Sequence, residues 1–498
     1  MKQKLWVSLL SAAVLAAGAF GFAACDEKGN EGESGGSSGT GVAAELAYAI
    51  LPGGDAYEVS GIGTVSDSAV TIPSEYNGLP VTSIGYNAFR NCTSLTSIAI
   101  PDSVTSIGVS AFRNCTALTD IDIPASVTSV GAGAFNGCTG LLQTEGGVSY
   151  VDGWAVGCAA DTTAVTLRAD TVGIADQAFR SCASLASVAL PESLDFIGDS
   201  AFNGCTALES VVLPAGVSVG DYAFKNCASL AGVTLPADML SIADYAFKGC
   251  VALTEIAIPA GVKSIGEGAF SSCIGLSEIV IPTGVTSVGA GAFSGCTQLL
   301  QVQDRVVYVD RWAVDFEEDS DDKDETATLR AGTVGIADQA FYACGELVGV
   351  TIPDGVAYIG GEAFLDCVKL PEIDIPDSVT AIGESAFNNC AALTHVAIPD
   401  GVVTIGDGAF WYCRSLESVI ISDSVVTIGN CAFECCNKLT AVYYFGDSAK
   451  WAEISIGEWN AALTSAVRYD YVEEETDVPD DGGKYWHYDS DGVTPVIW

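Results

Sequence analysis

The chain has 498 residues, of which 49% are hydrophobic and 17% charged, so it is long enough and apolar enough to bury an extensive core. It carries 63 acidic and 20 basic residues, a formal net charge of −43 at pH 7. Because such a surface repels phosphates, the composition argues against nucleic acid and anionic lipid headgroups as partners.

Residues 1–24 have the pattern of an export signal: a basic start, then an apolar run, then small residues. The cysteine directly after "FAA" resembles the lipobox of bacterial lipoproteins, although Phe22 stands where that motif usually has leucine. The resemblance implies cleavage before Cys25 and lipidation of its thiol, so that a lipid anchor is the only membrane contact of an exported surface protein. An ordinary secretory signal is the alternative, and the apolar run is short for a transmembrane anchor.

Two short regions separate this signal from the body of the protein. Residues 25–42 are rich in Gly and Ser and predict a flexible tether. Residues 43–80 predict an N-terminal β cap, with a hairpin around Gly53, Gly54 and Asp55.

A repeat fills residues 81–440. Fourteen phenylalanines each have a cysteine three residues later, at steps of 23 residues, except for one step of 22, one of 44 and one of 48. Such a period predicts a solenoid in which neighbouring coils bury one another. The phenylalanines are Phe89, Phe112, Phe135, Phe179, Phe202, Phe224, Phe247, Phe270, Phe293, Phe341, Phe364, Phe387, Phe410 and Phe433.

One coil shows the expected local structure. Ile98 and Ile100 alternate with small residues, which predicts a short strand with one face inward, and a proline ends it. Gly108 suits a turn with positive φ. Phe112 and Cys115 then fit one short helical turn, with both side chains on its buried side.

The cysteines of an exported protein suggest disulfides. Cysteines at the same position of stacked coils, however, have parallel Cβ vectors about 5 Å apart, which is poor disulfide geometry. We therefore predict a column of buried free thiols, outside which Cys158, Cys431 and Cys435 fall.

Acidic and basic residues recur four apart around the phenylalanine. They predict ion pairs along the helical turns, with a basic stripe for an anionic partner as the alternative. The pairs are Asp176 with Arg180, Asp221 with Lys225, and Asp244 with Lys248.

The unit L-x-x-I-x-I-P-x-x-V-x-x-I-G-x-x-A-F-x-x-C, exemplified by Leu95 to Cys115, resembles the repeat of BspA-like bacterial surface proteins, the Treponema pallidum type of leucine-rich repeat. The resemblance implies a leucine-rich repeat solenoid with a curved parallel β-sheet on its concave side, short helical turns or loops on its convex side, and β-rich caps. It also implies a non-enzymatic role in adhesion and in binding host or neighbouring-cell macromolecules, with no cofactor.

Two related inserts interrupt the repeat, near residues 141–172 and 299–334. "VSYVDGWAV" recurs as "VVYVDRWAV", which indicates duplication of a block of coils and a strand-rich hairpin in each insert. The second insert holds the acidic run 315–325; a solvated loop is expected there, since the run lacks the EF-hand calcium pattern.

After the repeat, residues 441–472 predict a C-terminal cap. Five aromatic residues suit covering the last coil: Tyr443, Tyr444, Phe445, Trp451 and Trp459. Residues 473–498 comprise an acidic linker and an aromatic tail, which is either a ligand contact through Tyr485, Trp486 and Tyr488 or a strap packed on the body.

Three outward strand positions in successive coils, Glu372, His395 and Ser418, align as an acid–His–Ser column. A hydrolase triad is one interpretation. The column is better explained as a solvated face, because ladder pairing uses the backbone amides that an oxyanion hole needs and nothing in the sequence excludes water. No metal site is predicted.

The outward strand positions are otherwise small or acidic and lack the Trp, Tyr and Arg typical of interface hot spots. Tyr342, Trp411 and Tyr412, beside the phenylalanine column, are alternative contacts. The sequence thus predicts a surface protein with an extracellular protein or glycan ligand. A carbohydrate-binding protein and a structural spacer are the alternatives.

Overall fold

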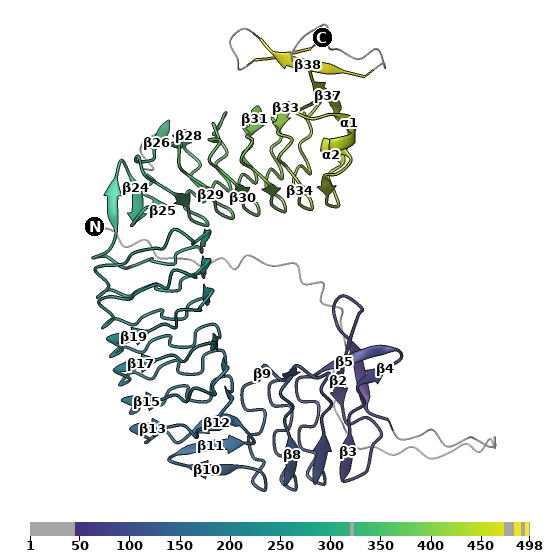
Figure 1. Cartoon of the computed structure of the whole chain (residues 1–498), viewed down its shortest axis with the longest axis vertical. Helices are drawn as coiled ribbons and strands as arrows, with labels where there is room; N and C mark the ends of the chain where they lie inside the picture. The colour runs from purple at the N-terminus through teal and green to yellow at the C-terminus, as the bar shows by residue number, and fades with distance from the viewer. Residues whose placement is uncertain (1–44, 319–322, 473–482, 490–493, 498) are drawn as a thin grey trace, which may run out of the picture. The chain divides into compact units, whose positions relative to one another are not determined.

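The computed structural model describes residues 45–318, 323–472, 483–489 and 494–497. The predicted signal, the tether with Cys25, and most of the acidic linker lie outside the described residues. The predicted solenoid is confirmed: successive coils stack through parallel strand pairing, and helix is confined in the described residues to two short segments. Figure 1 shows the coils running through the whole repeat region.

The predicted strands form a first ladder, on which Ser97 and Ala99 face outward and Ile98 faces inward. Each strand pairs in parallel with its equivalent one coil away, for example Ile98 with Ile121. The strands are β3 (Ala69–Thr71), β6 (Ser97–Ala99), β8 (Asp120–Asp122), β13 (Ala164–Thr166), β15 (Ser187–Ala189), β17 (Ser210–Val212), β19 (Gly232–Thr234), β26 (Glu325–Thr328), β28 (Leu347–Thr351), β31 (His395–Ile398), β33 (Ser418–Ile421), β35 (Ala441–Tyr444) and β37 (Val467–Tyr471).

A second ladder, which the sequence analysis did not predict, follows the first; in most coils a proline separates the two strands, and Arg168, Arg330 or Ser422 takes its place in three others. Its two-residue strands pair in parallel, as Ser106–Ile107 does with Ser129–Val130. They are β7 (Ser106–Ile107), β9 (Ser129–Val130), β14 (Gly173–Ile174), β16 (Phe196–Ile197), β18 (Ser218–Val219), β20 (Ser241–Ile242), β21 (Ser264–Ile265), β22 (Ser287–Val288), β27 (Gly335–Ile336), β29 (Tyr358–Ile359), β30 (Ala381–Ile382), β32 (Thr404–Ile405), β34 (Thr427–Ile428) and β36 (Ser455–Ile456).

At the N-terminus, the predicted hairpin is present: β1 (Ala47–Ile50) pairs antiparallel with β2 (Tyr57–Gly61). β2 then pairs in parallel with β5 (Leu79–Ile84), which continues into the second ladder, and β4 (Glu75–Tyr76) pairs with β5. The hairpin thus covers the first coil.

The helical turn predicted around each repeated phenylalanine is wrong. In the coil of Phe112, Ser110 and Asn114 have φ of +56° and +63°, which a right-handed helix excludes. The amides of Phe112 and Asn114 instead donate to the carbonyls of Ala134 and Asn136 in the next coil, at 2.8 and 2.7 Å. This segment is therefore a series of β-turns that are themselves hydrogen-bonded from coil to coil.

The same two positions, two before and two after the phenylalanine, have positive φ in all fourteen coils. Glycine, asparagine and serine recur there because they tolerate this conformation most easily. Cys431 and Cys435 occupy these positions, which explains why they lie outside the cysteine column. The prediction of positive φ at Gly108 is wrong: a Cβ there would lie 2.8 Å from the carbonyl carbon of Gly85, so close approach of two coils requires glycine.

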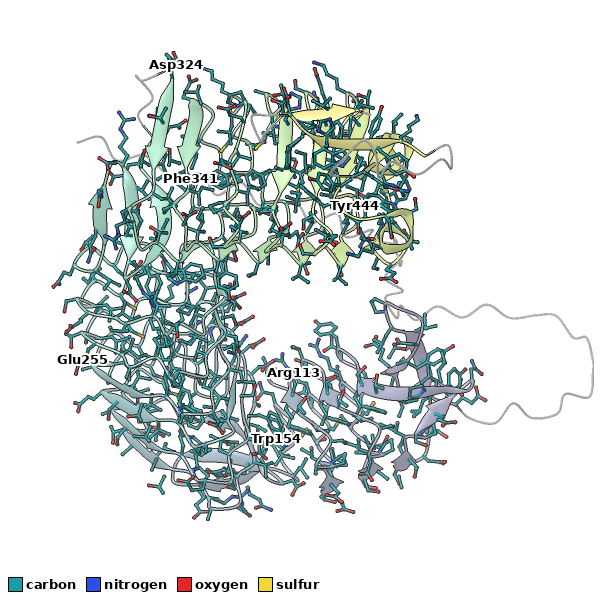
Figure 2. The ribbon with its side chains drawn as sticks, turned by 45° about the horizontal axis from the view of Figure 1, so that its top comes forward. Arg113, Trp154, Glu255, Asp324, Phe341 and Tyr444 are labelled. Carbon is teal, nitrogen blue, oxygen red and sulfur yellow. The ribbon has the colours of Figure 1, made fainter. Side chains whose placement is uncertain are left out.

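The repeated phenylalanines are at most 2% exposed, and Figure 2 shows Phe341 among the packed side chains of its coil. Consecutive rings stack with centroids 4.9–5.6 Å apart, as Phe89 does on Phe112 at 5.2 Å. The inward column predicted from the repeat is confirmed.

Every cysteine in the described part of the chain is free, as predicted. The column cysteines have a further role, because the Sγ of Cys115 donates to the carbonyl oxygen of Phe89, in the preceding coil, at 3.0 Å. Equivalent bonds are made by Cys138, Cys205, Cys227, Cys250, Cys273, Cys296, Cys367, Cys390, Cys413 and Cys436. Each thiol therefore fills space and satisfies a buried carbonyl.

The predicted ion pairs between acidic and basic residues four apart do not form, since the residues between them have positive φ and turn the side chains away from each other. Instead, Oδ1 of Asp176 accepts from the amide of Asp199 in the next coil at 2.9 Å. The bond recurs up the column, from Asp221 to Asp199, Asp244 to Asp221, and Glu267 to Asp244. Lys225 and Lys248 lie over the rings of Tyr222 and Tyr245.

The two inserts contain the predicted hairpins. The first is β10 (Gln143–Glu145), β11 (Val148–Val151) and β12 (Trp154–Cys158); the second is β23 (Gln301–Gln303), β24 (Val306–Val309) and β25 (Trp312–Phe316). In the first, Arg168 lies 4.0 Å from the ring centroid of Tyr150 and donates to Gln143 Oε1 and the Asp152 carbonyl at 2.9 and 2.8 Å.

Arg330 repeats this arrangement in the second insert. It stacks on Tyr308 at 4.1 Å and donates to Gln301 Oε1 at 2.9 Å and to the carbonyl of Asp310. The agreement between the two inserts, contact by contact, supports duplication of a block.

At the C-terminal end, α1 (Ser448–Trp451) and α2 (Ala461–Ser465) join the last coils. Tyr444 is buried against Trp451, with ring centroids 5.1 Å apart, as expected of a cap. Trp459 is 68% exposed and does not cover the coil, since its φ of +65° holds it in a turn.

Candidate binding groove

The aromatic residues beside the phenylalanine column do not form one site. Tyr342 is 48% exposed, and Trp411 and Tyr412 are half-buried against each other with ring centroids 5.1 Å apart. Tyr342 and Trp411 occupy the same repeat position three coils apart, a separation of about 14 Å at the usual strand spacing. They are separate surface features.

The aromatic tail extends the first ladder. Residues Tyr485–Tyr488 form β38, which pairs in parallel with β37, and Pro495–Ile497 form β39, antiparallel to β38; both are yellow in Figure 1. Trp486 is fully buried, and its Nε1 donates to the carbonyl of Tyr444 at 3.1 Å. Trp486 therefore packs the tail on the body, and its indole offers no surface to a ligand.

Tyr488 shares a strand face with Trp486, and their ring centroids are 5.0 Å apart. Tyr485 is on the opposite face and half-buried. The tail is thus a strap through Trp486, while Tyr488 reaches the cavity described next.

A groove of about 1230 Å³ runs across the outward face of the first ladder and ends at the tail. We call it the tail groove. Its floor includes Thr326, Thr351, Glu372, Asp374, His395 and Ser418, and its end is walled by Tyr443, Tyr488, Thr494 and Pro495. The solvated column expected from sequence therefore lies inside a hollow.

His395 and Ser418 are brought together as the alignment predicted. Their backbones are register partners in β31 and β33, and Nδ1 of His395 is 2.7 Å from Oγ of Ser418. Among the described residues Glu372 makes no hydrogen bond to His395, so the histidine lacks the acid that orients it in a triad. β31 and β33 pair in parallel over four residues, so the backbone amides that take part in this pairing are unavailable to an oxyanion.

Tyr443 and Tyr488 are both partly desolvated. Burial raises the pKa of both phenols. The carboxylates of Asp400 and Asp377 further raise the pKa of Tyr488. The tail end of the groove is therefore partly desolvated, with two carboxylates near Tyr488.

A second hollow, of about 870 Å³, lies on the same ladder face around Glu255 and Glu278. We call it the open groove. Val212 and Val280 line it and are 65% and 70% exposed, and no aromatic residue does so. Figure 2 places Glu255 at the edge of the molecule. Both grooves lie over equivalent positions of the repeat and contain acidic residues. Of the two, only the tail groove is lined by aromatic residues.

Comparison with known proteins identifies the repeat. Residues 68–152, 172–300 and 334–453 match the BspA type leucine rich repeat region, in six copies. The chain belongs to this family. The unmatched stretches of this BspA-type protein between the three ranges fall within the two inserts, although β10 and β11 of the first insert lie in the matched range.

Several solved structures are similar to this BspA-type chain. A leucine rich cell surface protein from Faecalibacterium prausnitzii is 28% identical, covering 82% of this chain and 95% of its own, with a TM-score of 0.32. A leucine-rich repeat protein from Bacteroides ovatus is 26% identical over 87% and 100%, with a TM-score of 0.28. A leucine-rich repeat protein from T. pallidum is 24% identical over 51% and 87%, with a TM-score of 0.25. No curated protein matches the chain.

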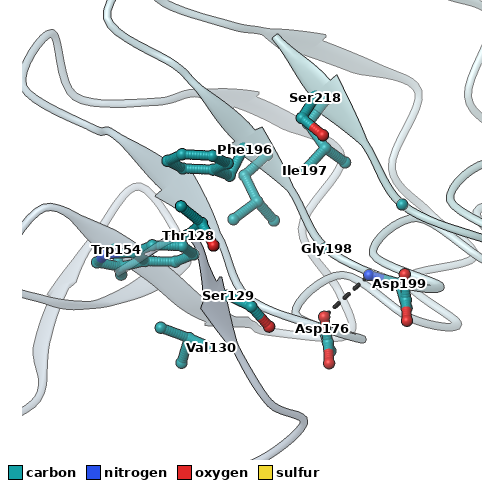
Figure 3. A pocket seen from close by; sticks show the side chains of 12 residues that line it. Thr128, Ser129, Val130, Trp154, Asp176, Phe196, Ile197, Gly198, Asp199 and Ser218 are labelled. Atoms are coloured by element: carbon teal, nitrogen blue, oxygen red, sulfur yellow. Dashed lines mark hydrogen bonds between the residues drawn. The ribbon is translucent and has the colours of Figure 1, made fainter. Parts of the chain in front are cut away.

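A third, smaller cavity of about 130 Å³ lies at the first insert, where β12 enters the second ladder (Figure 3). Trp154 and Phe196 stack in it with ring centroids 6.0 Å apart. Asp176 faces it, and burial raises the pKa of this carboxyl to about 6. The cavity has room for a few water molecules rather than for a macromolecular ligand.

The described residues of the BspA-type chain contain no group of three or more His, Cys, Asp or Glu placed to hold a metal ion. Nor do they contain a helix whose length and hydropathy would suit a membrane span.

Sequence reasoning aligned His395 and Ser418 but missed the walls of the groove. Thr494 and Pro495 carry no chemical signature, and their position depends on the pairing of β38 with β37. One signal was available: Trp486 and Tyr488 are two residues apart in a strand, so burial of the first places the second on the same face.

Proposed function

We propose that this protein is a non-enzymatic, lipid-anchored bacterial surface protein that binds macromolecules of a host or of neighbouring cells. The observation that carries the proposal is the tail groove, a cavity of about 1230 Å³ on an otherwise repetitive surface. It is large enough to hold part of a ligand, and its aromatic wall supplies the residue type that interface hot spots favour.

The position of the lipid supports a binding role. Lipidation of Cys25 would attach the protein at its N-terminal end, whereas the tail groove involves the last coils together with Tyr488, Thr494 and Pro495. The solenoid then acts as a spacer that presents the groove. Carbohydrate binding in the same groove is the second candidate, because two tyrosine rings, those of Tyr443 and Tyr488, and carboxylates line the same groove.

Two small residues at the same repeat position provide a matched test. Ala397 is exposed on the floor of the tail groove, and Ala189 is exposed at the equivalent position of β15, outside it. Cells that display the full chain should lose adhesion to an array of immobilised extracellular proteins and glycans when they carry Ala397→Trp, and keep it when they carry Ala189→Trp. Equal adhesion of both variants would refute the groove as the binding site.

The anchor has its own test. The wild-type chain should incorporate a labelled fatty acid and stay in the membrane fraction. Cys25→Ala should do neither, and a labelled Cys25→Ala chain would exclude lipidation at this thiol.

A further inference from the structure

We propose that the ligand of the tail groove is an extended, basic segment of a protein, with two Arg or Lys residues four positions apart. This inference rests on the proposed function, because it names the chemistry of what the groove binds. It is carried by the unpaired carboxylates on the floor, the aromatic wall, and the distance between them.

The floor holds two carboxylates without partners. Glu372 and Asp374 are exposed, and neither makes a hydrogen bond or ion pair with any described residue. Acidic side chains on either side are neutralised, since Glu346 pairs with Lys369 at 2.5 Å and Glu417 with Lys438 at 3.9 Å.

The described lining contains neither Lys nor Arg. An anionic ligand would therefore be repelled by the groove, whereas a cationic ligand would pair with the two carboxylates of the floor. Its approach is also favoured by the net charge of the chain, −43.

The wall suits a guanidinium or ammonium group. The faces of phenol rings attract cations, and Tyr443 and Tyr488 both line the end of the groove. Trp486 holds them in place from behind, with ring centroids 5.4 Å from Tyr443 and 5.0 Å from Tyr488. The wall is thus rigid before the ligand arrives, which lowers the entropic cost of binding.

The spacing follows from strand geometry. Asp374 and Tyr443 occupy the same strand position three coils apart, about 14 Å at roughly 4.8 Å per strand. An extended peptide rises about 3.4 Å per residue, so four residues span this distance and place both basic side chains on one face. The full floor, from Thr326 to Tyr443, covers five coil steps and accommodates about seven residues.

The experiment measures fluorescence anisotropy of labelled heptapeptides with the full chain. The probe is Gly-Arg-Thr-Ser-Thr-Arg-Gly, whose arginines are four apart. We expect it to bind at least about tenfold more tightly than the peptide with both arginines replaced by glutamate, and several-fold more tightly than one with arginines two apart. Binding should weaken as salt increases.

Variants of the groove locate the contact. Glu372→Gln with Asp374→Asn should weaken the probe about five- to tenfold, since two solvent-exposed charge pairs with the peptide are lost. Tyr488→Ala should weaken it about fivefold, and Tyr488→Phe should retain binding because the ring face is kept. The matched control, Glu255→Gln with Glu278→Gln in the open groove, should change the affinity less than twofold. Thermal unfolding of each variant reports whether the fold is intact.

Three outcomes would overturn the inference. Equal losses in the two double variants would mean that the peptide responds to net charge alone. Equal binding of the two arginine spacings would remove the geometric argument. Capture of a glycan or of an acidic protein, lost with Ala397→Trp while the probe does not bind, would refute the basic ligand and leave the proposed function standing.

Discussion

The column of phenylalanines and the outward positions of the first ladder run through the same coils. The inward residue is the same in every coil, whereas the outward residues differ from coil to coil. The inward position is phenylalanine in all fourteen coils, and its rings stack at nearly constant distance. The outward positions differ from coil to coil, for example Ser97 and Ala99 in one coil, Asp120 and Asp122 in the next, and Glu372 and Asp374 further along. A side chain whose main neighbour is its own copy must match that copy, whereas a side chain facing solvent is free to diverge.

The comparison therefore separates stability from recognition. Changes in the column should affect unfolding and leave the ligand contacts unchanged, while changes on the ladder face should do the reverse. The tail groove and the open groove allow a stricter comparison, because they lie over the same repeat positions and only the tail groove is bordered by the strap.

The largest expected effect is in the column. Phe247→Ala removes a ring that stacks on both neighbours, with centroids 5.6 Å from Phe224 and from Phe270, and it should lower the free energy of unfolding by about 3–5 kcal/mol. Denaturant titration followed by circular dichroism measures it. On the ladder face, Val280→Thr, at a side chain 70% exposed, should change it by about 0.5 kcal/mol or less. Similar losses from both changes would contradict the separation.

The inserts interrupt the phenylalanine column, and Arg168 and Arg330 stabilise the hairpins of the inserts. Arg330→Ala removes hydrogen bonds to Gln301 and Asp310 and the stack on Tyr308, and should cost about 2–3 kcal/mol of unfolding free energy. Arg168→Ala should cost a similar amount, because its contacts are equivalent. The same titration compares them, and a negligible cost in both would show that the inserts are held by their strands alone.

A smaller effect is expected at Asp176, whose pKa burial raises to about 6. The folded state then binds a proton more tightly than the unfolded state, so ionised Asp176 lowers stability above pH 6, and the penalty disappears as pH falls toward 4. Asp176→Asn can still accept from the amide of Asp199. We expect it to gain about 1–2 kcal/mol over wild type at pH 7 and nothing at pH 4. Unfolding measured at both values tests this, and a constant difference would rule out the shifted carboxyl.

Much of the fold was predictable because the same unit recurs fourteen times in the sequence. Ile98, Phe112 and Cys115 each recur in register, so their inward placement follows from periodicity and stacking alone. The second ladder escaped prediction because two residues per coil are too few to show an alternation. The supposed helical turn failed because a three-residue spacing also fits successive β-turns, and the Gly, Asn and Ser residues at positive φ were the signal that distinguishes them.

The candidate site was less predictable. The alignment of His395 with Ser418 follows from register, but the hollow around them depends on where the tail pairs. That pairing is a single event without a repeat to reveal it. Trp486 illustrates the problem: the aromatic sequence of the tail left both a ligand contact and a packed strap open, and burial against Tyr444 makes Trp486 a packing residue.

The sulfur column has a consequence for biogenesis. Export would bring the unfolded chain, with all its thiols accessible, into surroundings that favour disulfides. In the finished solenoid, burial raises the pKa of column thiols, that of Cys205 to about 12, and their hydrogens are engaged by carbonyls. Since each coil needs only its neighbour to be complete, we expect burial of the thiols to spread from coil to coil as the exported chain stacks. Cys158 stays half-buried, and the hydrogen bond from Cys182 lowers the pKa of its thiol, which favours its oxidation.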